Sequence, residues 1–228
     1  MASLPVLATQ RQKIVCGALA ALVCAVLYTA PGRLAQGRAV LLGMTDWEGG
    51  IPYVPLTVWL YLAQYPLLVA AYLGCGSLAR CTRFLYAVVV VQALAAAVFL
   101  LVPLRYPREL HVASAGTDPF TLALADWVRA IDPPVNCLPS LHVTSCVLSM
   151  LLVGFERTPR ALAFGTVATA SIASTLTFKQ HYAIDLLAGA LLAAAGWRVA
   201  GRIVAAGPAG FGPGNATPSG DNPVSAIK

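Results

Sequence analysis

Long apolar runs alternate with short polar segments along most of the chain, and the runs lack the polar face that a water-exposed helix would show. Each run approaches the roughly 20 residues that an α-helix needs to cross the hydrocarbon of a bilayer, although the fourth run is short. The runs cover residues 14–30, 51–73, 84–104, 140–155, 161–178 and 182–204. The pattern therefore predicts an all-α, polytopic membrane protein with about six transmembrane helices in a bundle across residues 1–206.

Two segments outside these runs differ from them in composition and pattern. Residues 207–228 are rich in Gly, Pro, Ser and Asn, which predicts a disordered tail. The loop at 109–138 contains "DPFTLALADWVRAID", whose apolar positions partly suit an amphipathic helix lying at the membrane interface. Such a helix could act as a lid or a lipid ramp, or it could simply connect two spans.

The composition supports a membrane location. Hydrophobic residues make up 58% of the 228 residues and charged residues 11%, and the mean hydropathy is +0.75; a soluble domain of this size rarely has such values. The net charge of +6 does not indicate a nucleic-acid partner, because the basic residues are scattered at the ends of the runs, as membrane anchors are. The predicted partner is the lipid bilayer, and the oligomeric state stays open.

The distribution of charge also predicts an orientation. Six crossings place both termini on one side of the membrane, and most of the basic residues collect on that side. They are Arg11, Lys13, Arg80, Arg83, Arg157, Arg160, Arg198, Arg202 and Lys228. Since cytoplasmic segments carry an excess of Lys and Arg, we expect a multi-pass protein with cytoplasmic termini.

The stretch "TFKQHYAID" places three polar groups between the last two runs: Lys179, His181 and Asp185. His181 and Asp185 are four residues apart, so a helix puts them on one face. A carboxylate that accepts the Nδ1–H of the imidazole fixes its tautomer and leaves the Nε2 lone pair available to a nucleophile or base. Asp185 lies within an apolar run, where an unpaired charge would cost several kcal/mol, so it needs such a partner.

A second group of polar residues lies at "NCLPSLHVTS", where the fourth run begins. Ser140 is a good N-cap, and His142 falls in the first helical turn. The free N–H groups of a helix N-terminus form an anion site, and an imidazole there can donate a proton to a leaving oxygen. An even number of crossings separates His142 from His181, so we expect both on the non-cytoplasmic face.

Fixed positive charge is expected on the same face, from Lys179 and from Arg105 and Arg108 in "VPLRYPREL". Two histidines, a carboxylate, a helix N-terminus and several cations suit phosphoryl transfer, which depends mainly on positioning and charge stabilisation. Taken singly, these groups have plainer interpretations: a helix cap or ion pair, snorkelling anchors, and a contact with lipid headgroups.

Metal binding is a rival use of His and Asp. A zinc site requires three or four close ligands. Here only two histidines and one carboxylate are expected, and the neighbouring cationic side chains would repel a metal ion. No metal and no cofactor is therefore expected.

"PSLH" at 139–142 followed by "HYAID" at 181–185 resembles the phosphatidic acid phosphatase type 2 superfamily. The resemblance runs from about residue 46 to 197 and is closest to the branch that includes inositol phosphorylceramide synthase-like proteins and bacterial membrane phosphatases. It implies a six-helix membrane core in which His181 is the nucleophile and becomes a phosphohistidine. It also implies that Asp185 orients His181, that His142 protonates the leaving group, and that Ser140 helps to hold phosphate oxygens.

The sequence departs from the family pattern at three places. Leu141 stands where the family has glycine, and Thr175 follows the matching serine where the family has arginine. Lys179 could replace that missing cation. The first family segment is absent as such, and "LRYPREL" stands in its place; between its two arginines we favour Arg108 over Arg105, because Pro-Arg recurs at this point in the branch.

These observations predict a metal-independent membrane enzyme that hydrolyses a lipid phosphate at the non-cytoplasmic surface. If an alcohol replaces water, the same site is a lipid phosphotransferase of the inositol phosphorylceramide synthase type. A non-catalytic protein that binds or transports anionic lipids is the alternative from another class. Which lipid phosphate is the substrate, and in which membrane, stays open.

Overall fold

A computed structural model describes residues 5–113, 116–132, 134–154 and 158–205. Within these residues the chain is almost entirely helical, so the predicted all-α membrane bundle is confirmed. The tail predicted at 207–228 lies outside the described residues.

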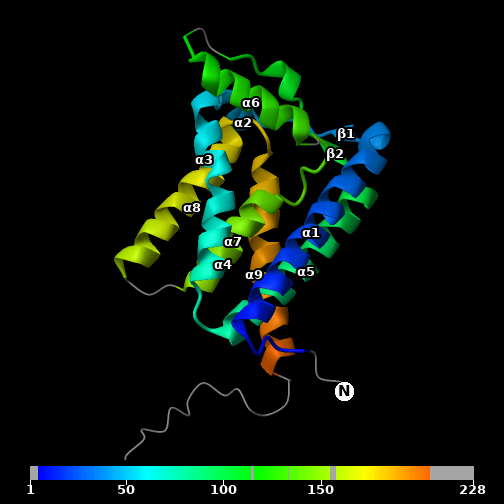
Figure 1. Cartoon of the computed structure of the whole chain (residues 1–228). Coiled ribbons are helices and arrows are strands. Elements are labelled where there is room, and N and C mark those ends of the chain that lie inside the picture. Colours follow the sequence, from blue (N-terminus) through cyan, green and yellow to red (C-terminus); the bar gives the residue numbers. More distant parts are fainter. Residues whose placement is uncertain (1–4, 114–115, 133, 155–157, 206–228) are drawn as a thin grey trace, which may run out of the picture.

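Long helices run side by side through the molecule (Figure 1). They are α1 (Gln10–Ala35), α3 (Val58–Leu62) continued by α4 (Gln64–Gly74), α5 (Leu78–Leu101), α7 (Leu141–Val153), α8 (Pro159–Thr177) and α9 (Ala183–Ala205). Helix α7 is central, because it packs against α4, α5, α8 and α9, whereas α1 packs mainly on α5.

Among the described residues, four helical segments are long and apolar enough to cross a membrane: 10–38, 55–74, 78–101 and 183–205. Helix α7 has 13 residues, in line with the short fourth run. Helix α8 has 19 residues but does not join these four, since Ser and Thr are frequent along it.

Several predicted boundaries are wrong, including both ends of the first run, 14–30 against Gln10–Ala35 for α1, and others are wrong for clear local reasons. The second run was expected to be helical from residue 51, but helix begins only at Pro55 with the 3₁₀ turn η2 (Pro55–Thr57), since proline is favoured at a first helical position. The third run was expected to start at residue 84, but α5 begins at Leu78, where the Ser77 side chain caps it by accepting from Arg80 N–H. It ends at Leu101, shortly before Pro103, which cannot continue a helix.

Short elements gather at one end of the bundle (Figure 1). They are α2 (Asp46–Gly50), α6 (Pro119–Ile131), the 3₁₀ turns η1 (Gln36–Arg38) and η3 (Arg108–Leu110), and the parallel strands β1 (Val40–Leu41) and β2 (Leu104–Arg105). At the other end Leu7 N–H donates to Thr82 Oγ1 at 3.1 Å, and Arg83 Nε donates to Trp197 O at 2.9 Å. The start of α1 and the end of α9 therefore share an end of the bundle.

Close contact between α7 and α9 depends on Gly189. A Cβ at this position would meet the carbonyl oxygen of Ser140 and lie 3.2 Å from Val143 Cβ. The Thr144 hydroxyl donates to Gly189 O at 3.0 Å, which joins the two backbones. The contact therefore sets the spacing of the two helix N-termini.

We expect Gly189→Ala to destabilise the protein by about 1–3 kcal/mol, because a backbone atom rather than a flexible side chain blocks the new methyl group. Thermal unfolding in detergent measures the effect. Gly165→Ala in α8 is the matched control, since its Cβ meets nothing within 4 Å. Equal unfolding temperatures for the two variants would contradict the proposed role of Gly189.

Candidate active site

The turn between α8 and α9 presents His181 to the end of the bundle where the short elements gather. Its Nδ1 lies 3.1 Å from Cys137 O and 3.3 Å from Asp185 Oδ2. Both oxygens are acceptors, so Nδ1 must carry the proton, and the neutral ring keeps a lone pair on Nε2. The contact predicted from the four-residue spacing is therefore present, with a carbonyl oxygen as a second acceptor.

Asp185 connects the two helix N-termini. Its Oδ2 also accepts from the Tyr182 N–H at 2.9 Å, and its carbonyl oxygen accepts from the Ser140 N–H at 3.1 Å. The residue is completely buried. Because Ser140 precedes α7 directly, these contacts place the start of α7 against the start of α9, the arrangement that counting the spans predicted.

Ser140 is the N-cap of α7, as predicted, since its hydroxyl accepts from Val143 N–H at 3.3 Å. His142 follows in the first turn, also as predicted. Its Nε2 lies 2.9 Å from Ser171 Oγ, and its ring stacks on Tyr61 at a centroid distance of 4.2 Å. Among the described residues, His142 Nδ1 is buried without a hydrogen-bond partner, so it is the ring nitrogen that the other protein contacts leave unpaired.

Lys179 lies inside the protein rather than at its surface. Its side chain is only 1% exposed, and Nζ donates to Glu48 O at 3.0 Å. Burial lowers the pKa of Lys179, and the nearby Glu48 carboxylate opposes this shift. The plain interpretation as a headgroup contact therefore does not fit, because a headgroup anchor would be exposed.

The two candidate arginines differ sharply. The Arg105 side chain is 41% exposed and pairs with Glu109 at 2.7 Å. Arg108 is nearly buried; it pairs with Asp132 Oδ2 at 3.1 Å and donates to Asp132 O at 2.7 Å. The Tyr61 hydroxyl donates to the same Oδ2 at 3.2 Å. Arg108 is thus connected through Asp132 and Tyr61 to the ring of His142, whereas Arg105 is not.

Sequence reasoning missed four side chains that hold these groups, as well as the carbonyl oxygen of Cys137. Ser171 binds His142, Tyr61 stacks on it, Asp132 binds Arg108, and Glu48 binds the turn around His181. The only hint for Ser171 was its place among the polar residues of an Ala-rich run. The other three come from segments for which no spacing rule predicts a contact with the site.

The predicted amphipathic helix is present as α6 and covers the same end of the bundle (Figure 1). Ala125 and Val128 pack in a cluster with Tyr61 and Phe178, and Phe178 precedes Lys179 in the chain. Trp127 on this helix is 56% exposed. Helix α6 therefore adjoins the candidate site on one side and offers apolar groups to its surroundings on the other.

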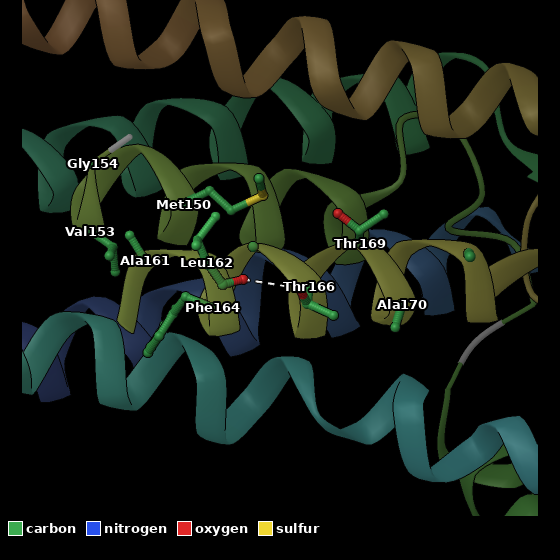
Figure 2. Close-up of a pocket in the computed structure, with 11 residues that line it drawn as sticks. Met150, Val153, Gly154, Ala161, Leu162, Phe164, Thr166, Thr169 and Ala170 are labelled. Atoms are coloured by element: carbon green, nitrogen blue, oxygen red, sulfur yellow. Dashed lines mark hydrogen bonds between the residues drawn. The ribbon is translucent and has the colours of Figure 1, made fainter. Parts of the chain in front are cut away.

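A cavity of about 660 Å³ lies between α7 and α8, away from these polar groups (Figure 2). Its lining is almost wholly apolar, from Met150 at one side to Ala170 at the other. Thr166 donates its hydroxyl to Leu162 O at 3.0 Å, the dashed line in Figure 2. None of the predicted site residues lines this cavity, so it offers no groups for phosphoryl chemistry.

The fold and the site define an all-α membrane protein with two histidines held at adjoining helix N-termini. A family model described as the PAP2 superfamily matches residues 54–199, which is more than half of the chain. The chain therefore belongs to the PAP2 superfamily, whose members are phosphatases and phosphotransferases. No curated protein matches the chain. Among the described residues, no group of three or more His, Cys, Asp or Glu side chains could hold a metal ion.

Proposed function

We propose that the protein is an integral membrane lipid-phosphate phosphatase that acts through a phosphohistidine on His181. The observation that carries this proposal is the pair of acceptors on His181 Nδ1, Cys137 O and Asp185 Oδ2. They leave Nε2 as the nucleophilic nitrogen. Membership of the superfamily supports the reaction class.

The reaction then proceeds in two steps. Nε2 of His181 attacks phosphorus in line, and the P–O bond to the lipid breaks while His142 gives its proton to the departing oxygen. We assign this proton to Nδ1 of His142 in its imidazolium form: Nε2–H donates to Ser171 Oγ, so loss of the Nδ1 proton leaves a neutral ring that can accept the proton of water in the second step. Water next attacks the phosphohistidine, giving its proton to His142, which releases inorganic phosphate and restores both rings.

The phosphate oxygens would be held by positive charge and by N–H groups. The N–H groups of Leu141 and His142, the first in α7, have no acceptor within the helix and would bind an anion, whereas Val143 N–H already donates to Ser140 Oγ. Lys179 uses one donor on Glu48 O and keeps the remaining donors of its ammonium group. Arg108 adds a charge that Asp132 holds in place.

The two arginines are expected to respond differently to substitution. We expect Arg108→Ala to lower kcat/KM by about 100-fold, the usual effect of losing one charged donor at a transition state. Arg105→Ala should stay within about threefold of wild type, because an exposed ion pair contributes little. Steady-state kinetics of phosphate release compares the two variants. The reverse order would place Arg105 at the phosphate.

A transferase of the inositol phosphorylceramide synthase type is the second candidate, and one observation favours it. Helix α6 places apolar side chains such as Phe120, 69% exposed, beside the site. Exposed apolar groups on a helix that packs on Tyr61 would favour an apolar alcohol over water as the acceptor. A non-catalytic protein could also bind an anionic lipid through Lys179 and Arg108, but it would have no need for a fixed tautomer of His181.

Purified protein in detergent distinguishes these functions. A phosphatase should release inorganic phosphate from a short-chain lipid phosphate with a metal chelator present, whereas a transferase should move label from a phospholipid to ceramide or another alcohol. Neither reaction would occur with a non-catalytic protein. We further propose that the site faces the non-cytoplasmic side, which labelling of single introduced cysteines in sealed vesicles would test.

A further inference from the structure

One residue from a distant segment contacts the turn of His181 at two points, once with its carboxylate and once with its backbone carbonyl oxygen. Glu48 lies in α2, and its side chain is 7% exposed. Its Oε1 accepts from the Ala183 N–H at 2.6 Å, and its carbonyl oxygen accepts from Lys179 Nζ at 3.0 Å. These contacts fall two residues before and two residues after His181.

Both ends of the turn need such support. Ala183 begins α9, and the first N–H groups of a helix have no partner within the helix. The Glu48 carboxylate supplies an acceptor there, where the helix dipole also favours negative charge. Lys179 has a φ of +58°, which is uncommon for a residue other than glycine and persists only when the surroundings hold it.

Glu48 is itself held firmly. Its Oε2 accepts from the Thr45 N–H at 2.9 Å and from the Thr45 hydroxyl at 2.7 Å, which completes a capping box at the start of α2. Burial acts to raise the pKa of Glu48, but the hydrogen bonds from Ala183 and Thr45 outweigh it, so the net shift is downward. The side chain is therefore an ionised acceptor with little freedom to move.

We infer that Glu48 is a positioning residue for His181 in the proposed reaction: its carboxylate fixes the backbone at Ala183, after His181, while its backbone carbonyl holds the Lys179 side chain before it, and the carboxylate contact aims Nε2 at phosphorus. This inference rests on the proposed function. Asp185 and Glu48 then have separate tasks, since Asp185 sets which nitrogen carries the proton and Glu48 sets where the ring lies.

Two conservative variants distinguish the effect of the length of the Glu48 side chain from the effect of its charge. Glu48→Asp keeps the charge but is one methylene too short to reach Ala183, so we expect kcat to fall about 100-fold, as for a displacement of about 1 Å. Glu48→Gln keeps the length and one oxygen for the Ala183 N–H, so the fall should be less than about tenfold. KM should stay within about threefold in both, because the phosphate ligands remain.

The control is Asp46→Ala, which removes an exposed carboxylate from the same short helix and should leave kcat within about twofold. Should Glu48→Asp fail to fold by gel filtration and thermal unfolding, Thr45→Ala, which removes the hydroxyl that holds Glu48, should lower kcat about tenfold. Wild-type kcat in that variant would then overturn the inference. An active Glu48→Asp beside an impaired Glu48→Gln would also overturn it, since charge alone would then matter, and so would a loss confined to KM.

A spectroscopic measurement separates this inference from the proposed function. In ¹⁵N-histidine NMR, the wild-type His181 should give the signals of a neutral ring protonated at Nδ1, and Glu48→Asp should shift or broaden them. Unchanged His181 signals in Glu48→Asp would overturn the positioning role. Absence of phosphate release and of phosphate transfer by the wild type, with those signals altered in the variant, would instead overturn the proposed function alone.

Discussion

Replacement of His181 by Ala is expected to lower the rate of phosphate release at least about 10⁴-fold, because no other side chain at the site would form the covalent intermediate. The measurement is release of inorganic phosphate from a short-chain lipid phosphate by purified protein in detergent. Residual binding groups, such as Arg108 and the N-terminus of α7, should leave KM within about tenfold of the wild-type value.

His111→Ala is the matched control for this variant. His111 lies at the same end of the bundle, packed on Tyr106 at a centroid distance of 5.8 Å, and it has no part in the proposed reaction. We expect its kcat to stay within about threefold of wild type. Undiminished activity in His181→Ala would end the histidine mechanism.

Asp185→Asn should have the next largest effect, a fall in kcat of about 10³- to 10⁴-fold. The amide keeps the volume of the fully buried side chain but removes the negative charge, so its single oxygen holds the Nδ1 proton of His181 less strongly than the carboxylate does. The neutral ring can then place its proton on Nε2, which removes the nucleophilic lone pair; substitutions that select the wrong tautomer have effects of this size.

Kinetics must be read together with stability for this variant, because Asp185 Oδ2 also accepts from the Tyr182 N–H at the start of α9. We expect a modest decrease in the unfolding temperature and a far larger loss of kcat. A variant that unfolds more easily but keeps its turnover in the folded state would show that Asp185 only caps the helix.

Much of the fold was predictable because apolar runs long enough to cross a bilayer have few alternatives to helix. The boundaries were less predictable, since they depend on local groups such as Pro55 and the Ser77 cap rather than on hydropathy. The strands β1 and β2 have two residues each, too few for any period to show.

Some contacts of the candidate site were likewise predictable from the sequence, and others were not. The His181–Asp185 contact and the Ser140 cap follow from short spacings, and the meeting of α7 and α9 follows from the number of crossings. Glu48 and Asp132 act across long sequence separations, and one sequence contains no rule that pairs them with Lys179 or Arg108. Such contacts depend on how loops fold over the end of the bundle.

The central claim is that His181 becomes covalently phosphorylated, and rapid quenching tests it most directly. Protein mixed with ³²P-labelled lipid phosphate, quenched under alkaline conditions and digested, should yield an acid-labile label on the peptide that carries His181, and none in His181→Ala. A label on another residue, or turnover without any trapped label in wild type and in the slowed Arg108→Ala variant, would contradict the account.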